Sequence, residues 1–198
     1  MDNPPEEDPV IPEMTAVDTV ETTRALLLTS NIPDFTIDHA ASKYQCSKST
    51  IYSLGNTKNE IVYRVLVSFF KELTQRTHLA LGGNKPVPAK LQDYFRAINS
   101  ALQPASPAFM QDLIATEVGK KVYDHNTKAA IETIRNLLEE GVIRGEFQAV
   151  DTHLIAAFVG HTMEHIQQGD YLHLASVTEA YAALDTLIRN GLSTPPAP

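Results

Sequence analysis

A short stretch in the first third of the chain gathers side chains suited to binding phosphate groups and base edges. Lys48, Ser49, Thr50 and Tyr52 occupy almost consecutive positions, and Lys58 follows shortly after them. Lysine ammonium groups neutralise phosphates or donate to guanine, and hydroxyl groups donate to either kind of acceptor. The stretch therefore has the residue types that DNA recognition needs, provided that the fold presents them on one surface.

A second candidate for chemistry lies in the last third of the chain, where His161, Glu164 and His165 fit the pattern His-x-x-Glu-His. Histidines four residues apart share a helical face and can bind zinc, with the glutamate as a base. His153 falls on the same predicted face, and a third ligand would be His173, Glu179 or Asp185. Nothing in the spacing marks one of them. A histidine pair in a pocket or an interface is therefore favoured, and we predict no metal site, no cofactor and no enzymatic activity.

Both candidate sites lie in stretches where apolar residues repeat with the spacing of an α-helix. Apolar residues recur at intervals of three and four along most of the chain, and no stretch alternates with the period of two that is typical of strands. The pattern predicts an all-α fold of about nine helices: residues 17–28, 37–44, 48–53, 58–81, 88–102, 107–118, 126–140, 152–168 and 177–190.

Residues that cap helices support these boundaries. Ser/Thr-x-x-Glu boxes are predicted at two helix starts, and a Ser-Pro pair and an aspartate mark two others. These caps are Thr57 with Glu60, Ser176 with Glu179, Ser106 before Pro107, and Asp151. Gly141 and Gly191 are predicted to end two helices, where a left-handed residue is preferred.

The composition limits the classes of protein to which the chain can belong. It has 198 residues, a net charge of -8, a single cysteine and no tryptophan. No apolar run has the roughly 20 residues of a membrane-spanning helix, and the N-terminus lacks the features of a signal peptide. We therefore expect a soluble, cytoplasmic protein with no membrane partner. Because the net charge is negative, any binding of DNA must depend on a local surface.

Prolines and charges divide the chain into segments. Residues 1–14 are acidic and proline-rich and are predicted to be disordered, and residues 192–198 form a second proline-rich tail. Between the tails, the breaks suggest a small unit followed by a larger one, with the main internal loop beginning at Gly82.

The short helices predicted at residues 37–44 and 48–53 have the size and spacing of a helix-turn-helix, with Gln45, Cys46 and Ser47 between them. In that motif the second helix enters the major groove. Thr57 would cap the following helix, whose free N–H groups and Lys58 would form a phosphate site. The alternative is an ordinary amphipathic segment after a tight turn, which spacing alone does not exclude.

The segment FTIDHAASKYQCSKSTIYSLGNTKNEIV resembles the N-terminal signature of the tetracycline-repressor (TetR) family. The matching residues are Thr36, Ala40 with Ala41, Ser47 to Tyr52, and Lys58, and the downstream segment LEEGVIRGEFQAVDTHLIAAFVGH resembles the approach to the penultimate helix of the family. The resemblance implies a DNA-binding domain at residues 15–62 and a ligand-binding and dimerisation domain at residues 63–191. The DNA-binding residues that it implies are Thr36, Gln45, Ser47, Lys48, Ser49, Thr50, Tyr52 and Lys58.

The chain departs from the family pattern at three places. Gln45 stands where the family usually has glycine, and Leu54 and Gly55 replace an aromatic pair. We expect Gly55 to loosen the end of the reading helix. An acidic tail replaces the basic residues that many relatives carry before the first helix. DNA affinity is therefore expected to be weak or strongly dependent on salt.

The resemblance also implies a homodimer built from the last two helices of each subunit, which would read a near-palindromic operator. Small residues and an apolar stripe on these helices are compatible with such an interface. The predicted interface residues are Ala156, Gly160, His165, Val177, Tyr181, Leu184 and Ile188. In the alternative interpretation, the same stripes bury the core of a monomer.

Family members hold a small-molecule pocket among their middle helices. The residues proposed to line it are Phe69, Phe70, Tyr94, Phe109, Met110, Tyr123, Phe158 and His161, although aromatic residues at helical spacing fit a core equally well. A mostly apolar lining predicts a mostly apolar inducer. The residues and the resemblance together predict a ligand-responsive, dimeric transcriptional regulator. The favoured form is a repressor, which the inducer releases from the operator. The alternative is a dimer with the same fold that binds a ligand or a partner and has lost its affinity for DNA.

Overall fold

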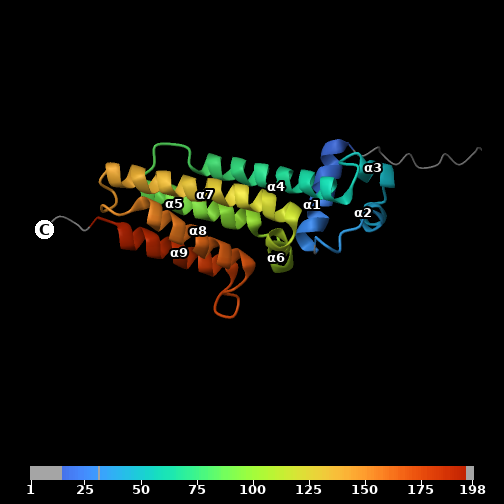
Figure 1. Ribbon diagram of the computed structural model, residues 1–198. Helices are drawn as coiled ribbons and strands as arrows, with labels where there is room; N and C mark the ends of the chain where they lie inside the picture. Colours follow the sequence, from blue (N-terminus) through green and yellow to red (C-terminus); the bar gives the residue numbers. More distant parts are fainter. Residues whose placement is uncertain (1–14, 31, 195–198) are drawn as a thin grey trace, which may run out of the picture.

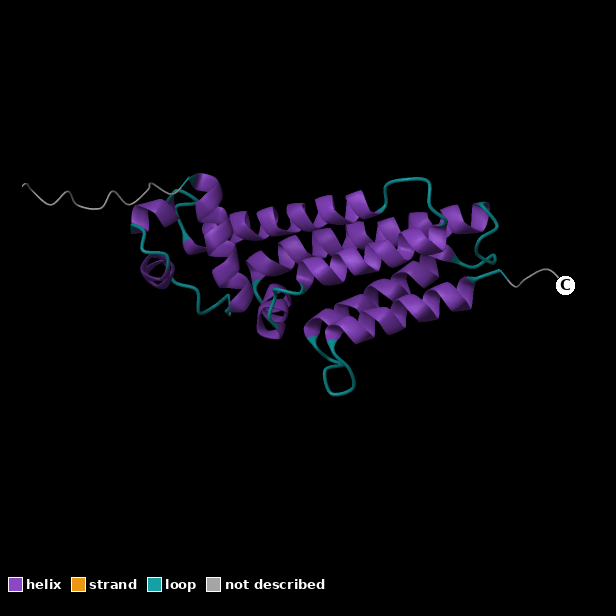
Figure 2. Cartoon of the chain, turned by 180° about the vertical axis from the view of Figure 1, so that it is seen from behind, coloured by secondary structure: helices purple, strands orange, loops and turns teal. Residues whose placement is uncertain are grey.

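The computed structural model describes residues 15–30 and 32–194, and these residues form nine α-helices. The helices are α1 (Ala16–Thr29), α2 (Ile37–Lys43), α3 (Lys48–Tyr52), α4 (Lys58–Ala80), α5 (Val87–Leu102), α6 (Pro107–Ala115), α7 (Glu117–Ile143), α8 (Thr152–Gln168) and α9 (Val177–Leu192). No strand is drawn in the described part of the chain (Figure 2). The predicted all-α fold is confirmed.

The helices form a small unit at one end of a long bundle. Helices α1, α2 and α3 lie together at that end, while α4, α5, α7, α8 and α9 run roughly along the long axis (Figure 1). Helix α6 lies between the two parts. The boundary predicted at residues 62 and 63 falls inside α4, which runs without a break from the small unit into the bundle. Helix α4 therefore connects the small unit directly to the bundle.

One helix is much longer than the sequence predicted. Helix α7 begins at Glu117 rather than at residue 126, and α6 ends at Ala115 rather than at residue 118. The additional turns carry a run of charged residues that hides their apolar positions. Gly119, Val122 and Tyr123 are nevertheless buried, at the spacing of one helical face.

The two glycines predicted to end helices lie inside them instead. Helix α7 continues through Gly141 to Ile143, and the left-handed residue that follows is Gly145, with a φ of 70°. A Cβ atom at Gly141 would lie 2.2 Å from Cδ2 of Phe147, so this position requires glycine for close packing. Gly191 lies within the last turn of α9. Both predictions were wrong. Gly141 is needed for close packing against Phe147, and nothing in the packing explains the glycine at position 191.

Most predicted caps are present. Ser176 and Glu179 form a complete capping box, and Ser106 and Asp151 accept hydrogen bonds from backbone N–H groups in the first turns of α6 and α8. The box at Thr57 is incomplete. The Thr57 hydroxyl accepts from the Glu60 N–H at 3.2 Å, but the Glu60 carboxylate accepts from the Asn56 N–H at 2.7 Å.

The predicted tails lie mostly outside the described residues, which exclude residues 1–14 and 195–198. Residues 192–194, assigned to the second tail, belong to the fold. The Leu192 carbonyl accepts from the Gln148 N–H at 2.9 Å, and the Thr194 hydroxyl donates to the Gly145 carbonyl at 2.9 Å. None of the described helices combines the length and the hydropathy needed for a bilayer crossing.

Candidate nucleic-acid interface and internal cavity

Helix α3 presents a hydroxyl-rich surface at the outer end of the small unit. Ser47 caps it and accepts from the Thr50 N–H at 3.1 Å, and the Ser47 hydroxyl also lies 2.6 Å from that of Ser49. Ile51 is fully buried, which fixes the side of α3 that faces the unit. Tyr52 is exposed on the other side. The local sequence thus orients most of the predicted DNA-binding residues of α3 toward solvent.

The turn between α2 and α3 places Gln45 in the left-handed region, with a φ of 51°. Residues with a Cβ atom adopt this conformation at a cost of roughly 1–2 kcal/mol, whereas glycine does not. We expect Gln45→Gly to raise the free energy of unfolding by about 0.5–1 kcal/mol, since relief of strain is partly offset by a more flexible unfolded chain. Urea unfolding measures this change. Gln45→Val is the control and should destabilise the protein, and equal stabilities of the two variants would contradict the assignment of strain.

Lys48 is paired with an acidic residue that the sequence did not associate with it. Its Nζ atom lies 2.5 Å from Oδ1 of Asp38 in the first turn of α2. The hydrogen bond and the charge of Asp38 raise the pKa of Lys48 above its ordinary value. Residues 40–58 contain no Asp or Glu, as the sequence indicated, but the fold brings Asp38 against this basic stretch. Asp38 therefore competes with phosphate for Lys48.

The start of α4 has a mixed charge. Lys58 donates from Nζ to the Pro33 carbonyl at 2.6 Å, and Glu60 lies in the same first turn. The expectation that Gly55 loosens the end of α3 does not fit the packing, because a Cβ atom there would lie 2.7 Å from Cβ of Glu60. Glycine at this position permits close contact between the turn and α4.

Two further residues, Thr36 and Arg64, help to position α2 and α3. Thr36, a predicted DNA-binding residue, is exposed and caps α2 by accepting from the His39 N–H at 3.1 Å. Arg64 on α4 donates to the carbonyls of Ser53 and Leu54 at 3.4 and 3.3 Å. Sequence reasoning missed Arg64, because nothing in its local spacing indicates that it reaches the end of α3.

A partly open cavity of about 90 Å³ lies between α4, α5, α7 and α8. Of the residues predicted to line a pocket, Phe70, Tyr94 and Tyr123 line this cavity, and Phe69 lines a separate depression. Phe109 and Met110 are buried in the core away from its lining. The remaining lining is rich in hydroxyl and amide groups that the sequence analysis did not select: Thr74, Thr77, Asn126, Thr127, Thr133 and Gln167.

Phe158 and His161 are not part of the cavity. Both side chains are exposed on the outer face of α8, where 58% of Phe158 is accessible to solvent. Their neighbours in sequence, Val159 and Met163, point inward instead. The prediction placed both residues on the wrong face, because apolar residues occur on both faces of α8.

The polar groups of the cavity are neutral and partly connected to one another. Tyr123 donates to Oε1 of Gln167 at 3.1 Å, and Nε2 of Gln167 donates to the Tyr181 hydroxyl at 2.7 Å. Burial raises the pKa of Tyr94 to about 12 and also raises the pKa values of Tyr123 and Tyr181. These phenols therefore stay protonated near neutral pH, and the cavity lining carries no formal charge.

The predicted interface residues mostly face the interior of their own subunit. Ala156 is fully buried, and a Cβ atom at Gly160 would lie 2.4 Å from Cγ1 of Ile131 on α7. These small residues therefore serve the packing of α7 on α8. The α9 stripe is likewise part of the monomer core or packed against it: Val177, Tyr181, Leu184 and Ile188.

Apolar side chains remain exposed on the other faces of these two helices. Leu154 and Phe158 lie one turn apart on α8, in line with His161 and His165, and Leu187 is exposed on α9. Together with Ala183 on α9, these residues are called the outer face of α8 and α9 below. The exposed apolar residues of α8 and α9 thus differ from the interface residues that were predicted from the sequence.

The histidines of the His-x-x-Glu-His pattern each contact a carboxylate. Nδ1 of His161 lies 3.3 Å from Glu164, and Nδ1 of His165 lies 2.6 Å from Asp170. Of the three candidates for a third ligand, Asp185 is engaged by Arg189 at 2.7 Å. Within residues 15–30 and 32–194, no group of three side chains is placed to hold a metal ion.

Sequence comparison finds no matching family model and no curated protein with significant similarity. Solved structures do match, over about nine-tenths of this chain. A protein from Saccharomonospora viridis solved in complex with choline is 15% identical, covers 90% of this chain and 97% of its own, and has a TM-score of 0.76. A TetR transcription regulator from Haloarcula marismortui is 16% identical, with coverages of 90% and 98% and a TM-score of 0.74. A TetR-family regulator from Agrobacterium tumefaciens is 12% identical, with coverages of 90% and 97% and a TM-score of 0.73. The chain therefore has the fold of the TetR-family transcriptional regulators.

Proposed function

We propose that this protein is a DNA-binding transcriptional regulator that acts as a homodimer and responds to a small, mostly apolar molecule. The observation that carries the proposal is the exposed surface of α3 at the outer end of the molecule. Ser47, Lys48, Ser49 and Tyr52 are exposed there, while Ile51 anchors the helix. A short helix with hydroxyl and lysine side chains fits the major groove and can contact both bases and phosphates.

The outer face of α8 and α9 supports the proposed dimer. Phe158 and Leu187 are large apolar side chains that a second copy of the chain would remove from water. A two-fold interface on α8 and α9 would leave the small unit of each subunit free at the far end of the bundle. A dimer so arranged would read an operator with two-fold symmetry.

The cavity supports a ligand-responsive regulator. It lies between α4 and α8, one of the two helices that carry the proposed interface, and α4 continues into the small unit. Asp112 on α6 also accepts from the Ile32 N–H at 2.7 Å, which ties the loop after α1 to the bundle. A ligand that moves α4 or α6 would thereby change the separation of the two reading helices. The complex of the S. viridis protein with choline is a precedent for a small molecule bound to this fold.

Selection from random duplex DNA tests the DNA-binding part of the proposal. The purified protein is used at low salt and at near-physiological salt, and the enriched sequences are read. We expect a motif with two-fold symmetry whose half-sites lie about one helical turn apart or a multiple of it. Lys48→Ala is the matched variant and should reduce enrichment. Recovery of no motif at either salt would contradict the proposal.

Removal of the charge on Asp38 should strengthen operator binding. Asp38→Asn removes the partner of Lys48 and an acidic charge from the DNA-facing surface. We expect operator affinity to rise by about threefold to tenfold, and the slope of log K against log salt to steepen by about one unit. Fluorescence anisotropy over a series of salt concentrations measures both quantities.

Asp124→Asn is the control for this prediction, because Asp124 lies on α7, outside the small unit, where it pairs with the exposed Lys120. It should leave both the affinity and the slope unchanged. A response of the same size in the two variants would mean that only the net charge matters and that the pair of Asp38 with Lys48 has no specific role.

The pair of Lys48 with Asp38 also favours the second candidate function. A dimer with this fold that binds a ligand or a partner without DNA would have no need of a free Lys48. In that case Lys48→Ala would leave its activity unchanged, and the DNA selection would return no motif.

A further inference from the structure

A groove between α4 and α7 lies outside the cavity and is lined by both cationic and apolar side chains. The apolar part of the lining consists of Tyr63 and Val67, which are partly exposed, and the buried Val122. Lys71 on α4 and Lys121 on α7 are the two lysines of its lining. Its volume is about 600 Å³, much larger than that of the cavity. The lining also includes His125, one turn after Lys121, and contains no acidic side chain.

The lysines of this groove lack the carboxylate partners that most other basic residues have. Among residues 15–30 and 32–194, the lysines and arginines without a hydrogen bond or ion pair are Lys43, Lys71, Lys121 and Lys128. Two of these four line the groove. Lys121 lies above the Tyr63 ring, with its Nζ atom 5.8 Å from the ring centroid. In a chain with a net charge of -8, this is a local concentration of unneutralised positive charge.

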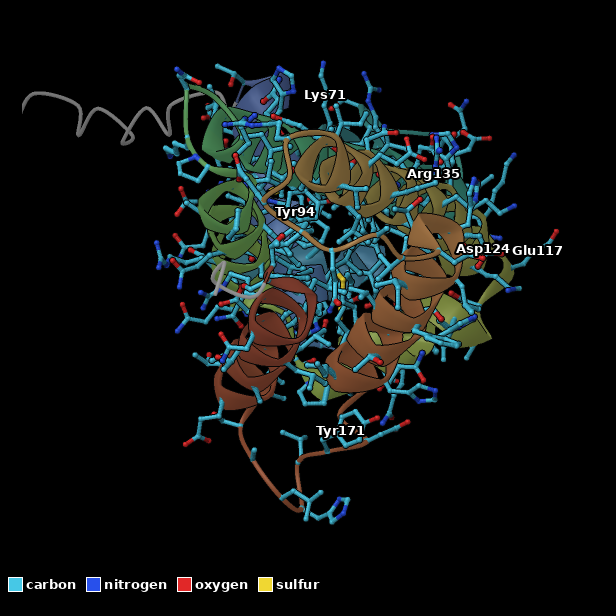
Figure 3. All side chains as sticks on the ribbon, turned by 90° about the vertical axis from the view of Figure 1, so that its left-hand side faces the viewer. Lys71, Tyr94, Glu117, Asp124, Arg135 and Tyr171 are labelled. Atoms are coloured by element: carbon cyan, nitrogen blue, oxygen red, sulfur yellow. The ribbon has the colours of Figure 1, made fainter. Side chains whose placement is uncertain are left out.

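The groove and the cavity share a wall. Phe70 and Asn126 line both of them. Asn126 is fixed by a hydrogen bond from Nδ2 to the Val122 carbonyl at 2.8 Å, and the Phe70 ring packs edge-on to Tyr123 with centroids 6.4 Å apart. Figure 3 shows Lys71 at the outside of the bundle and Tyr94 in its interior. A molecule that spans the shared wall would thus have one end among cations and the other among neutral, largely apolar groups.

We propose that the groove between α4 and α7 binds the anionic head group of a single-chain amphiphile whose apolar chain enters the cavity. The inference rests on the proposed ligand-responsive function and adds the chemical class of the ligand. A carboxylate or a phosphate monoester fits the lysines of the groove, whereas an anion in the cavity would have no cationic partner among the lining residues. An engineered cavity of about 150 Å³ binds benzene, so on the same scale this cavity takes about three to four chain atoms, and the rest of the chain would lie along the apolar residues of the groove.

Calorimetric titration of the full-length protein with four compounds of one chain length tests the head group. The compounds are octanoate, octyl phosphate, 1-octanol and octyltrimethylammonium, each below its micelle concentration and without DNA. We expect one or both anions to bind at least about fivefold more tightly than octanol, and the cation to bind most weakly. The preference for anions should decrease at high salt. The two anionic compounds distinguish a carboxylate from a phosphate.

The variant Lys71→Ala with Lys121→Ala tests the position of the head group. It should weaken binding of the preferred anion about fivefold to twentyfold and leave octanol binding unchanged. Lys120→Ala is the matched control, since it removes the neighbouring lysine, which pairs with Asp124 and does not line the groove. It should change neither affinity.

The outcomes separate this inference from the proposed function. Equal binding of octanol and the anions, or an unchanged affinity of the double variant for the anion, would overturn the head-group site while leaving an apolar inducer in place. Failure of all four compounds to bind would overturn both the head-group site and the role of the cavity. Neither result would affect the DNA-binding proposal, which the selection experiment tests without any ligand.

Discussion

Phe158→Asp combined with Leu187→Asp is expected to convert the protein to a monomer and to weaken operator binding at least about a hundredfold, because each carboxylate would be buried unpaired. The two side chains lie on the outer face of α8 and α9, with 58% and 71% of their surface exposed in one chain. Neither contributes to the buried core of the subunit, so the fold should persist. Sedimentation velocity measures the oligomeric state, and fluorescence anisotropy with the selected operator measures affinity.

The control for this variant places the same charges elsewhere. Leu79 at the end of α4 and Ile143 at the end of α7 are exposed to 78% and 85%, and neither lies on α8 or α9. Leu79→Asp with Ile143→Asp should leave a dimer that binds the operator normally. If Phe158→Asp with Leu187→Asp also leaves a dimer at the same protein concentration, the proposed interface is wrong.

Gly141→Ala is expected to lower the free energy of unfolding by about 2–3 kcal/mol, the usual effect of forcing an extra carbon into a packed core. The added Cβ atom would lie 2.2 Å from Cδ2 of Phe147, whose side chain is buried. Phe147 has little freedom to withdraw, since its N–H donates to the Gly141 carbonyl at 3.1 Å and its backbone forms a bridge with Ser193. Urea unfolding followed by circular dichroism measures the change.

Gly191→Ala is the matched control for Gly141→Ala. Gly191 lies in the last turn of α9 without a positive φ, and a Cβ atom there would have no neighbour within 4 Å. Alanine should therefore stabilise this helix by about 0.5–1 kcal/mol, through helix propensity and a less flexible unfolded chain. The two variants are compared at one protein concentration because dimerisation shifts apparent stability. Equal effects of the two substitutions would contradict the packing described for Gly141.

The proposed ligand class follows from how polar and charged groups are separated in the bundle. Neutral hydroxyl and amide groups line the cavity, while the unpaired lysines lie on the other side of Phe70 and Asn126. The prediction of a mostly apolar inducer and the proposal of an anionic head group are therefore compatible. They describe the two ends of one molecule.

The sequence by itself determined the helices of the small unit and most of the caps, because these depend on residues close together in the chain. Thr57, Ser106, Asp151 and Ser176 accept hydrogen bonds from N–H groups three residues further on. The resemblance to the TetR family likewise indicated a special turn at Gln45, because family members usually have glycine there. Local hydrogen bonds and steric limits do not depend on the rest of the fold.

Only the tertiary structure decided which face of a helix points inward and which distant residues meet. Periodicity found the α9 stripe that includes Leu184 and Ile188, but it could not decide whether that stripe faces the core or a second subunit, because apolar residues such as Leu187 also occur on the other face. The pair of Lys48 with Asp38 and the shared wall at Phe70 and Asn126 join different helices. Such contacts depend on the packing of whole helices against one another, which no short stretch of sequence specifies.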